Sequence, residues 1–245
     1  MARLFGTDGV RGIANDSLTP ELAYHLGRAA AYIFGQNKEH PTFLIGRDTR
    51  RSGTMLADIL AAGIASAGGD CYMVGVIPTP AIAYLTRTHH MDAGVMISAS
   101  HNPFEYNGIK FFDGFGYKLP DETEDKIEEC MLKDERAALQ SRPTGAAIGT
   151  ISTWTDLQQE YADFICKSTD VDLSGLKVVH DGANGSASVL GPEILKRLGA
   201  EVIAIHHEPN GININDNCGS THLESLKETV LKYGDDVGIA KDGDA

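Results

Sequence analysis

The chain has 245 residues, of which 42% are hydrophobic and 22% charged, and its formal net charge is −13. This composition indicates a soluble globular protein with enough apolar residues for one large domain or two ordinary ones. The acidic balance argues against nucleic acid or an anionic membrane as a partner, because both attract clustered positive charge.

Helix and strand patterns alternate through the first half of the chain. The glycine-rich residues 3–12 show neither pattern and are expected to form a loop. Thr19 and Pro20 then predict the start of an amphipathic helix, and Gly35 predicts its end. The further elements are expected as strand 42–45, helix 56–67, strand 71–76, helix 80–89, strand 93–97, a turn at Asn107-Gly108, strand 109–112 and an acidic helix from 120 to about Lys133.

Residues 140–150, which begin Gln140-Ser141, carry no apolar periodicity, and we place a domain boundary at their end. Helices and strands alternate again after it, so the sequence predicts two doubly wound α/β domains, 1–150 and 151–245. The elements of the second half are expected as helix 157–165, strand 177–180, helix 189–198, strand 202–205, a polar linker ending in an N-cap at Thr221, helix 223–230 and strand 237–240.

Ser100 lies in the stretch around which the rest of the chain is organised. The apolar run 93–97 predicts a buried strand, and Pro103 predicts that a loop begins before it. Ser100 would then stand just past the carboxyl end of a strand, where open α/β sheets bind their ligands. Taken alone, an ordinary serine loop is the simpler interpretation. A hydrolase pair of Ser100 with His101 is disfavoured, because adjacent residues rarely meet in that geometry and the G-x-S-x-G elbow is absent.

Basic side chains gather in glycine-rich loops although the chain is acidic overall. Arg47, Arg50 and Arg51 lie at a strand-to-helix junction, where they could hold a phosphate together with the helix N-terminus. A solvated basic loop explains the same three residues equally well. If the ligand is a phosphate ester, these arginines together with Arg11 and Lys110 are the candidate counter-charges.

Asp242 and Asp244 follow the last predicted strand. Their spacing points both side chains the same way on an extended loop, as shared coordination of a cation requires. Two aspartates around a glycine are also an ordinary turn, so the pattern alone leaves both interpretations open.

The four cysteines lie far apart, and no C-x-x-C pair occurs. A zinc site, a redox motif and a disulfide framework are therefore not expected. The start of the chain carries no signal-peptide pattern, and no apolar run is long enough to cross a bilayer. These features favour a cytoplasmic protein with reduced thiols and no membrane partner.

Four motifs carry a resemblance to a known superfamily. Residues 98–103, Ser-Ala-Ser-His-Asn-Pro, resemble the phosphoserine signature of the α-D-phosphohexomutases. The opening residues 5–12 and the loop 46–53 are similar to the phosphoglucosamine mutases of that superfamily, and Asp-Gly-Asp at 242–244 resembles the beginning of its metal loop. The resemblance spans the whole chain, which would correspond to about the first half of a superfamily member.

The resemblance implies the first two of four α/β domains with mixed sheets around a central cleft. It implies an isomerase that interconverts glucosamine 6-phosphate and glucosamine 1-phosphate, through a phosphoserine enzyme and a bisphosphate, for UDP-N-acetylglucosamine and cell-wall synthesis. Ser100 would carry the phosphoryl group, with His101 beside it, and Lys110 and Arg11 would assist proton transfer and hold phosphate. One Mg²⁺ ion would bind Ser100, Asp242 and Asp244, and a homodimer is left open.

The end of the chain departs from the superfamily pattern. The chain stops at Ala245, before the third aspartate of the metal loop, the sugar-recognising loop and the final phosphate-binding domain, and Lys241 stands where an apolar aromatic residue is usual. The ending therefore resembles a truncation, and a chain of this length is expected to be inactive alone and to bind Mg²⁺ weakly. A phosphomannomutase, a phosphoglucomutase and a non-catalytic phosphate- or metal-binding module stay open as alternatives.

Overall fold

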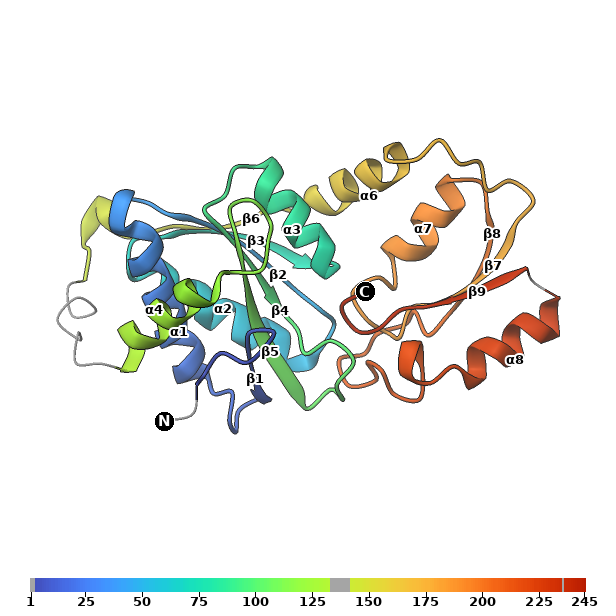
Figure 1. Ribbon diagram of the computed structural model, residues 1–245, viewed down its shortest axis with the longest axis horizontal. Helices are drawn as coiled ribbons and strands as arrows, with labels where there is room; N and C mark the ends of the chain where they lie inside the picture. The colour runs from blue at the N-terminus through green and yellow to red at the C-terminus, as the bar shows by residue number, and fades with distance from the viewer. Residues whose placement is uncertain (1–2, 133–141, 235) are drawn as a thin grey trace.

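The computed structural model describes residues 3–132, 142–234 and 236–245, and these residues form two α/β units side by side (Figure 1). Each unit has one sheet with helices on both faces, which confirms the expected class of two successive doubly wound α/β units. No helix in the described part is long and apolar enough to cross a membrane.

The larger sheet has the strand order β1-β5-β4-β2-β3-β6. It is mixed, because β5 runs antiparallel to its neighbours β4 and β1, while β4, β2, β3 and β6 pair in parallel. The loops after β2 and β4 therefore emerge at the same edge, where open sheets place their ligands. The strands are β1 (Val10–Ile13), β2 (Thr42–Arg47), β3 (Asp70–Val76), β4 (Ala93–Ile97), β5 (Tyr106–Asp113) and β6 (Ile151–Thr153).

Helices cover both faces of this sheet because its central strands are apolar on both sides. In β2, Phe43 and Ile45 pack into the core with α1 (Pro20–Phe34), α2 (Arg51–Ala65) and α4 (Asp121–Leu132). Leu44, between them in the strand, packs on the opposite face with α3 (Thr79–Thr88). Each of these fully buried side chains stabilises the fold by about 1.5–3 kcal/mol. Helix α1 begins as predicted, since the Thr19 hydroxyl accepts a hydrogen bond from the Leu22 amide at 3.2 Å.

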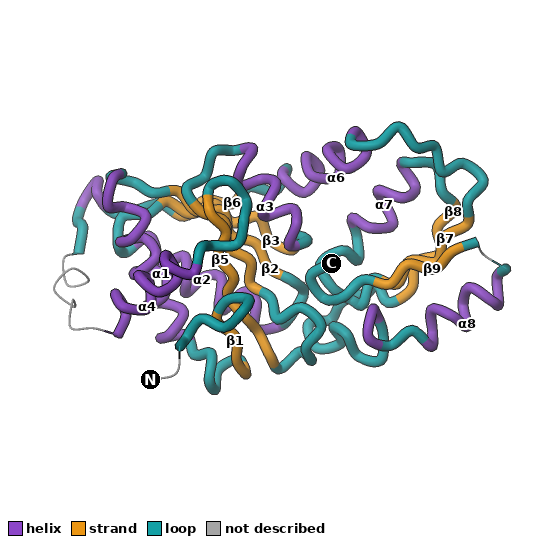
Figure 2. The backbone as a smooth tube through the Cα atoms, in the orientation of Figure 1, coloured by secondary structure: helices purple, strands orange, loops and turns teal. Residues whose placement is uncertain are grey.

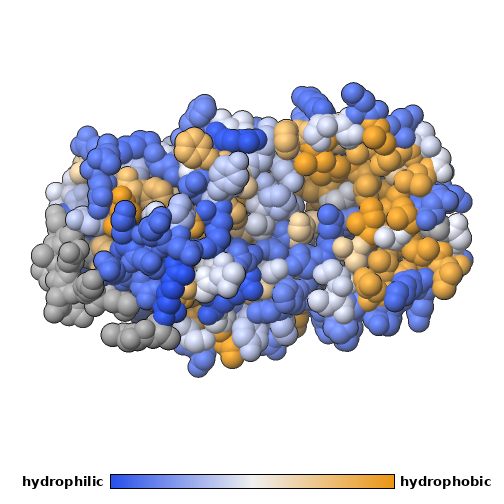
Figure 3. Space-filling view, viewed as in Figure 1, coloured by the Kyte–Doolittle hydropathy of each residue, from blue (hydrophilic) through white to orange (hydrophobic). Residues whose placement is uncertain are grey.

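The smaller sheet has the parallel order β8-β7-β9, from strands β7 (Lys177–Asp181), β8 (Glu201–Ile205) and β9 (Val237–Ala240). Helix α7 (Leu190–Arg197) lies on one face of it and α8 (Glu224–Tyr233) on the other (Figure 2). On the side shown in Figure 3, apolar side chains gather over this unit, whereas the larger unit is mostly polar. Short 3₁₀ turns occur at Gly35–Asn37, Gly145–Ala147 and Gly219–Thr221.

Helix α6 (Leu157–Lys167) joins the two units. Its residues Leu157 and Tyr161 belong to the same buried cluster as Ile82 of α3 and Leu190 of α7. The units thus share apolar core, which fixes one against the other. Strand β6 pairs with β3, so the larger sheet extends past residue 150. The predicted division into 1–150 and 151–245 stays a prediction.

The turn expected at Asn107-Gly108 is wrong, because both residues lie inside β5 and pair with Gly12 and Arg11 of β1. The physical reason is a close approach of two backbones. A Cβ atom on Gly108 would lie 2.6 Å from the carbonyl oxygen of Ser98, so only glycine fits between the strands.

Other boundaries also differ from expectation. Residues 10–12, expected in a loop, belong to β1 (Val10–Ile13), because pairing with β5 supplies hydrogen bonds that their own pattern does not predict. Thr221 ends a 3₁₀ turn and does not cap α8, whose N-cap position is Leu223. The predicted helix end near Lys133 lies outside the described residues. So do Gln140 and Ser141, the first residues of the stretch 140–150 at the predicted domain boundary.

Candidate active site

The carboxyl ends of β2 and β4 in the larger sheet face those of β7 and β9 in the smaller one, and their loops touch. After β2, the Thr49 hydroxyl donates to the carbonyl oxygen of Asn184, which follows β7, at 2.5 Å. After β4, the Ser100 hydroxyl donates to Asp242 Oδ2, which follows β9, also at 2.5 Å. The candidate site is therefore built by both units and does not exist in either alone.

Lys110 is the second charged centre of the site. It lies in β5, next to the strand that leads to Ser100, and is 7% exposed. Its ammonium nitrogen lies 2.8 Å from Asp244 Oδ2 and 2.9 Å from Asp8 Oδ2. The Thr79 hydroxyl, at the start of α3, donates to the same Asp244 oxygen at 2.7 Å. Asp244 therefore joins β5, α3 and the end of the chain in one hydrogen-bonded group.

The pKa of the Asp244 carboxyl lies below its ordinary value of 3.8. Burial is the largest influence and raises this pKa, but the Lys110 charge, hydrogen bonds from Lys110 and Thr79, and the nearby Ser100 hydroxyl together outweigh it. Asp244 is consequently ionised at neutral pH, which is the state that a cation ligand requires.

Arg11 reaches the site through Asp8. Its guanidinium pairs with Asp8 Oδ2, the oxygen that also contacts Lys110. Arg11 is exposed at the end of this chain of charges, and its guanidinium has five N–H donors, more than Asp8 can accept. The arrangement leaves Arg11 free to hold an incoming anion.

His101 is exposed, and within the described residues it makes no hydrogen bond or ion pair with Ser100 or Lys110. Its side chain instead lines a hollow of about 530 Å³ between the units, with Phe104, Asn217 and His222 among the other lining residues. The role expected for His101 stays a prediction.

Ser100 has a left-handed backbone, with φ at 55°. For a residue with a Cβ atom this conformation costs on the order of 1–2 kcal/mol, so its surroundings must hold it. The Ser100 amide donates to Ser98 Oγ at 3.0 Å, and that hydroxyl donates to Asp48 Oδ2 at 2.6 Å. Asp48 in turn pairs with Arg50, and both side chains are fully buried.

The burial of Arg50 answers the question left open for the basic loop. Arg50 is 1% exposed and forms an ion pair with Asp48, so it is neither solvated nor available to a phosphate. Arg51 is exposed at the first position of α2, and its backbone amide donates to the Gly211 carbonyl oxygen of the second unit at 2.8 Å. Of the predicted counter-charges, Lys110 and Arg11 are the ones whose charged groups pair with the site carboxylates Asp8 and Asp244.

Gly243 separates Asp242 from Asp244, and the space around it requires a glycine. A Cβ atom at this position would lie 2.6 Å from the Ser100 carbonyl oxygen and 3.0 Å from Asn215 Nδ2. Glycine thus lets the 242–244 backbone pack directly on the Ser100 loop, which brings Asp242 to the serine hydroxyl.

The described residues contain no cluster of three His, Cys, Asp or Glu side chains that could hold a metal ion. The chain offers two carboxylates, Asp242 and Asp244, and the Ser100 hydroxyl, and all three are joined by contacts within one group. These are oxygen donors, which suit a hard cation such as Mg²⁺. The donor chemistry fits the ion, although the set of carboxylates is small.

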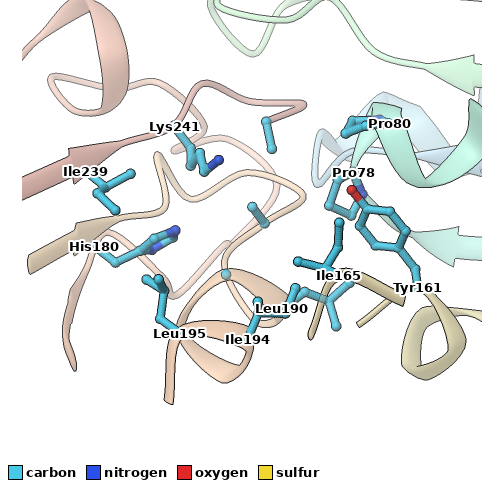
Figure 4. Close-up of a pocket in the computed structure, with 13 residues that line it drawn as sticks. Pro78, Pro80, Tyr161, Ile165, His180, Leu190, Ile194, Leu195, Ile239 and Lys241 are labelled. Carbon is cyan, nitrogen blue, oxygen red and sulfur yellow. The ribbon is translucent and has the colours of Figure 1, made fainter. Parts of the chain in front are cut away.

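A separate apolar cavity of about 220 Å³ lies between α6, α7 and β9 (Figure 4). His180 of β7 and Lys241 both point into it, and Lys241 thus takes up the position after β9 where an apolar residue was expected. His180 is 1% exposed, and neither ring nitrogen has a hydrogen-bond partner in the described part of the chain. Ser100, Lys110 and Asp242 do not line this cavity, so it is distinct from the candidate site.

His180 gives a first testable prediction. Burial, and secondarily the Lys241 charge, lower the pKa of His180 to about 4 from 6.5. As pH falls from 6.5 towards 4, the unfolded chain takes up a proton at this residue and the folded chain does not, so the free energy of unfolding falls. The loss approaches about 3 kcal/mol. In urea titrations at several pH values, His180→Phe should show a smaller loss across this range than the parent.

The matched control is His222→Phe, because His222 is exposed in the same unit. This control should keep the acid sensitivity of the parent. Identical pH dependence of the parent and His180→Phe would contradict a neutral, buried imidazole.

Several residues of the site were not named as functional from the sequence. Asp8 and Asp48 stand inside the glycine-rich motifs, where an aspartate is also an ordinary turn residue. Thr79 lies between two prolines that predict only a helix start, and Asn215 lies in a polar linker. For Asp8 and Asp48, the position inside the two glycine-rich motifs is the feature that could have drawn attention to them.

Comparison with known proteins defines the class. The family model described as "Phosphoglucomutase/phosphomannomutase, alpha/beta/alpha domain I" matches residues 2–138. The model of the corresponding domain II matches residues 159–245. The chain belongs to the phosphoglucomutase/phosphomannomutase family. Within it, the chain is 56% identical to a phosphoglucosamine mutase from Desulforamulus reducens and 55% identical to one from a Thermoanaerobacter strain, which confirms the predicted resemblance.

These alignments cover all of this chain but 55% and 54% of those two relatives, so the chain spans about half the length of the curated relatives it matches. A solved structure of a phosphoglucomutase/phosphomannomutase family protein from Burkholderia thailandensis is 27% identical, with a TM-score of 0.82. That match covers 99% of this chain and 53% of the other. The fold and the expectation of a first half are thus confirmed.

Proposed function

We propose that this chain provides the phosphoryl-carrying half of a phosphoglucosamine mutase. The observation that carries the proposal is the Ser100 hydroxyl 2.5 Å from Asp242, in one group with Lys110 and Asp244, in a chain of this family. A mutase needs a group that accepts a phosphoryl from one sugar oxygen and returns it to another, and a positioned serine beside a carboxylate meets that need.

The residues divide the work as follows. When a phosphoryl group moves from a sugar bisphosphate to Ser100, the P–O bond to the sugar breaks and a P–Oγ bond forms. The hydroxyl proton must leave, and Asp242 Oδ2 is within hydrogen-bond distance to take it. The sugar oxygen freed by the cleavage takes up a proton in exchange and becomes a hydroxyl, so the transfer consumes no net proton. Lys110 places a positive charge beside the incoming phosphoryl oxygens, and Arg11 extends that charge outward. The reverse transfer gives the phosphoryl group back to the other sugar hydroxyl.

Mg²⁺ would be held by Asp242, Asp244 and an oxygen carried by Ser100. When bound, the ion would neutralise negative charge on the transferring phosphoryl group. Lys110 already occupies one face of Asp244, so the ion and the ammonium would share that carboxylate.

The sugar assignment rests on the similarity to phosphoglucosamine mutases, since no residue described here reads the sugar. Phosphomannomutase and phosphoglucomutase activities are the alternatives. The test joins residues 1–245 to the remaining half of the Desulforamulus reducens relative and assays the chimera with glucosamine, mannose and glucose phosphates. Preferred turnover of glucosamine 6-phosphate supports the proposal, and absence of turnover of all three overturns it. A cytoplasmic location and a homodimer stay predictions.

Removal of one carboxylate should weaken Mg²⁺ binding. Asp242→Asn keeps the shape of the side chain but removes its charge, and we expect the affinity measured by calorimetry to fall at least about tenfold. The chimera should bind Mg²⁺ more tightly than residues 1–245 alone. Asp216→Asn, an exposed change in the same unit, serves as control and should leave the affinity unchanged. Equal affinity of Asp242→Asn and the parent would remove Asp242 from the ion site.

Arg11→Ala should affect activity far more than stability. The Arg11–Asp8 pair is solvent-exposed, and such pairs contribute at most about 1 kcal/mol to folding. Loss of a phosphate-holding guanidinium should lower turnover of the chimera about 10–100-fold. Arg51→Ala removes an exposed arginine outside the Ser100 group and should turn over normally. Equal losses in the two variants would mean that Arg11 acts only through the overall charge.

A further inference from the structure

Two carbonyl oxygens of the Ser100 loop, residues 98–103, are each held by two donors from elsewhere in the chain. Arg50 donates through one guanidinium nitrogen to the carbonyl oxygens of Ser100 and Asn102, at 3.1 and 2.5 Å. Asn215 donates through Nδ2 to the same two oxygens, at 2.9 and 3.0 Å. One donor follows β2 in the larger unit, and the other lies between β8 and α8 in the smaller unit.

Both donor side chains are themselves fixed. Arg50 is buried and paired with Asp48. Asn215 is 9% exposed, and its backbone amide donates a hydrogen bond to the Ala183 carbonyl oxygen at 2.9 Å. Gly243 packs so closely on the Asn215 side chain that a Cβ atom there would lie 3.0 Å from Nδ2. Neither donor can follow the loop if the loop moves, so the four hydrogen bonds define one loop conformation.

That conformation decides where the serine hydroxyl points. Ser100 has its φ at 55°, a region that residues with a Cβ atom avoid. A peptide rotation that relieved the strain would swing the Ser100 carbonyl away from both donors and carry the Cα–Cβ bond with it. The hydroxyl would then leave Asp242, which it contacts at 2.5 Å. The four hydrogen bonds to the carbonyl oxygens of Ser100 and Asn102 therefore fix the direction of the Ser100 side chain.

We propose that Asn215, together with Arg50, is a positioning residue that holds the Ser100 loop in the conformation competent for phosphoryl transfer. The inference rests on the proposed phosphoserine function. Asn215 belongs to the smaller unit, so the aim of Ser100 depends on the two units staying in contact. A residue that only held the units together would contribute to stability but would not set the rate of transfer in the bound complex.

The first test measures the loop directly in residues 1–245 and needs no activity. Asn215→Ala is compared with Asn217→Ala by amide hydrogen exchange at Ser100 and Asn102. Both asparagines have a left-handed backbone, with φ at 58° and 50°, so the conformational cost of alanine is shared. Asn217 donates only to its neighbour Asp216. We expect Asn215→Ala to raise exchange about tenfold or more, because it loses two hydrogen bonds, and Asn217→Ala to resemble the parent.

The second test follows phosphorylation of Ser100 in the chimera, in single turnovers measured by intact-mass spectrometry, with a hexose 1,6-bisphosphate as donor. In Asn215→Ala the maximal rate should fall about tenfold, while the half-saturating bisphosphate concentration stays within about twofold of the parent value. Arg50→Lys, which keeps a positive charge beside Asp48, should likewise lower the maximal rate and leave the half-saturating concentration nearly unchanged. Asn215→Asp keeps the side-chain volume without the N–H donor and replaces the alanine variant if that variant does not fold.

The outcomes separate the two levels of the proposal. Equal exchange in Asn215→Ala and Asn217→Ala overturns the positioning role, whatever the activity. A raised half-saturating concentration with an unchanged maximal rate also overturns it, in favour of a role in binding. If no chain accepts a phosphoryl group, the proposed function fails, and the exchange measurement still decides whether Asn215 holds the loop.

Discussion

Ser100→Ala should abolish phosphoryl transfer while the chain folds like the parent. The half-buried Ser100 hydroxyl donates only one hydrogen bond, to Asp242, and the backbone contacts of its loop do not involve the side chain. Loss of the nucleophile should lower turnover of the chimera at least about 10³-fold. The loss of stability should stay near 1 kcal/mol, the net contribution of one hydrogen bond.

The measurements are Ser100 phosphorylation by mass spectrometry in residues 1–245, turnover in the chimera and unfolding in urea for both. Ser220→Ala, an exposed serine in the smaller unit, is the matched control and should retain activity. Near-normal turnover in Ser100→Ala would exclude Ser100 as the phosphoryl carrier and with it the proposed function.

Lys110→Met should reduce both activity and stability. The structure changes the expectation for this residue, because Lys110 is 7% exposed and compensates the carboxylate of Asp244, which is 5% exposed. Removal of the ammonium leaves a buried negative charge without its partner, which should cost about 3 kcal/mol of the free energy of unfolding. Loss of the positive charge beside the phosphoryl group should lower turnover about 10²–10³-fold.

The pH dependence tests whether Asp244 is the cause. In the parent, the lowered pKa of Asp244 means that its ionised form stabilises the fold above pH 3.8, and this contribution is lost as pH falls through the folded-state pKa. Without Lys110, burial should instead raise that pKa. The stability difference between parent and Lys110→Met should therefore be largest near neutral pH and shrink below about pH 4.

Lys126→Met is the control for this experiment, since Lys126 is an exposed lysine in the same unit. It should have little effect on turnover and at most about 1 kcal/mol on stability. A Lys110→Met protein with parent-like stability at neutral pH would contradict the assigned contact with Asp244.

Whether a prediction was confirmed depended on how far apart in the chain the interacting residues lie. Helix α1 begins at Thr19 as expected, because a cap is satisfied by residues three positions apart. The strand at residues 10–13 and the continuation of β5 through Asn107 and Gly108 were missed, because each depends on a partner about 100 positions away in the chain. Local pattern cannot report such a partner.

The same contrast between local and distant interactions applies to the candidate site. Ser100, Lys110, Asp242 and Asp244 were named from motifs, and the structure brings them into one group, although their roles stay predictions. His101 was named beside Ser100, yet consecutive side chains diverge, and it lines the hollow between the units. Asn215 was not named as functional, although the loop 211–222 that contains it also resembles the superfamily, because an asparagine in a polar linker is most simply a turn residue.

The sequence by itself determined the alternation of helices and strands, the acidic character and the small set of motif residues, because periodicity, charge and turn chemistry are local properties of the chain. Only the tertiary structure decided what the basic loop does. Arg50 could hold a phosphate or face solvent as far as its neighbours in sequence reveal, but folding buries it against Asp48 and under the Ser100 loop. A buried charge must be neutralised close by, and the partner that neutralises it is chosen by packing between distant segments.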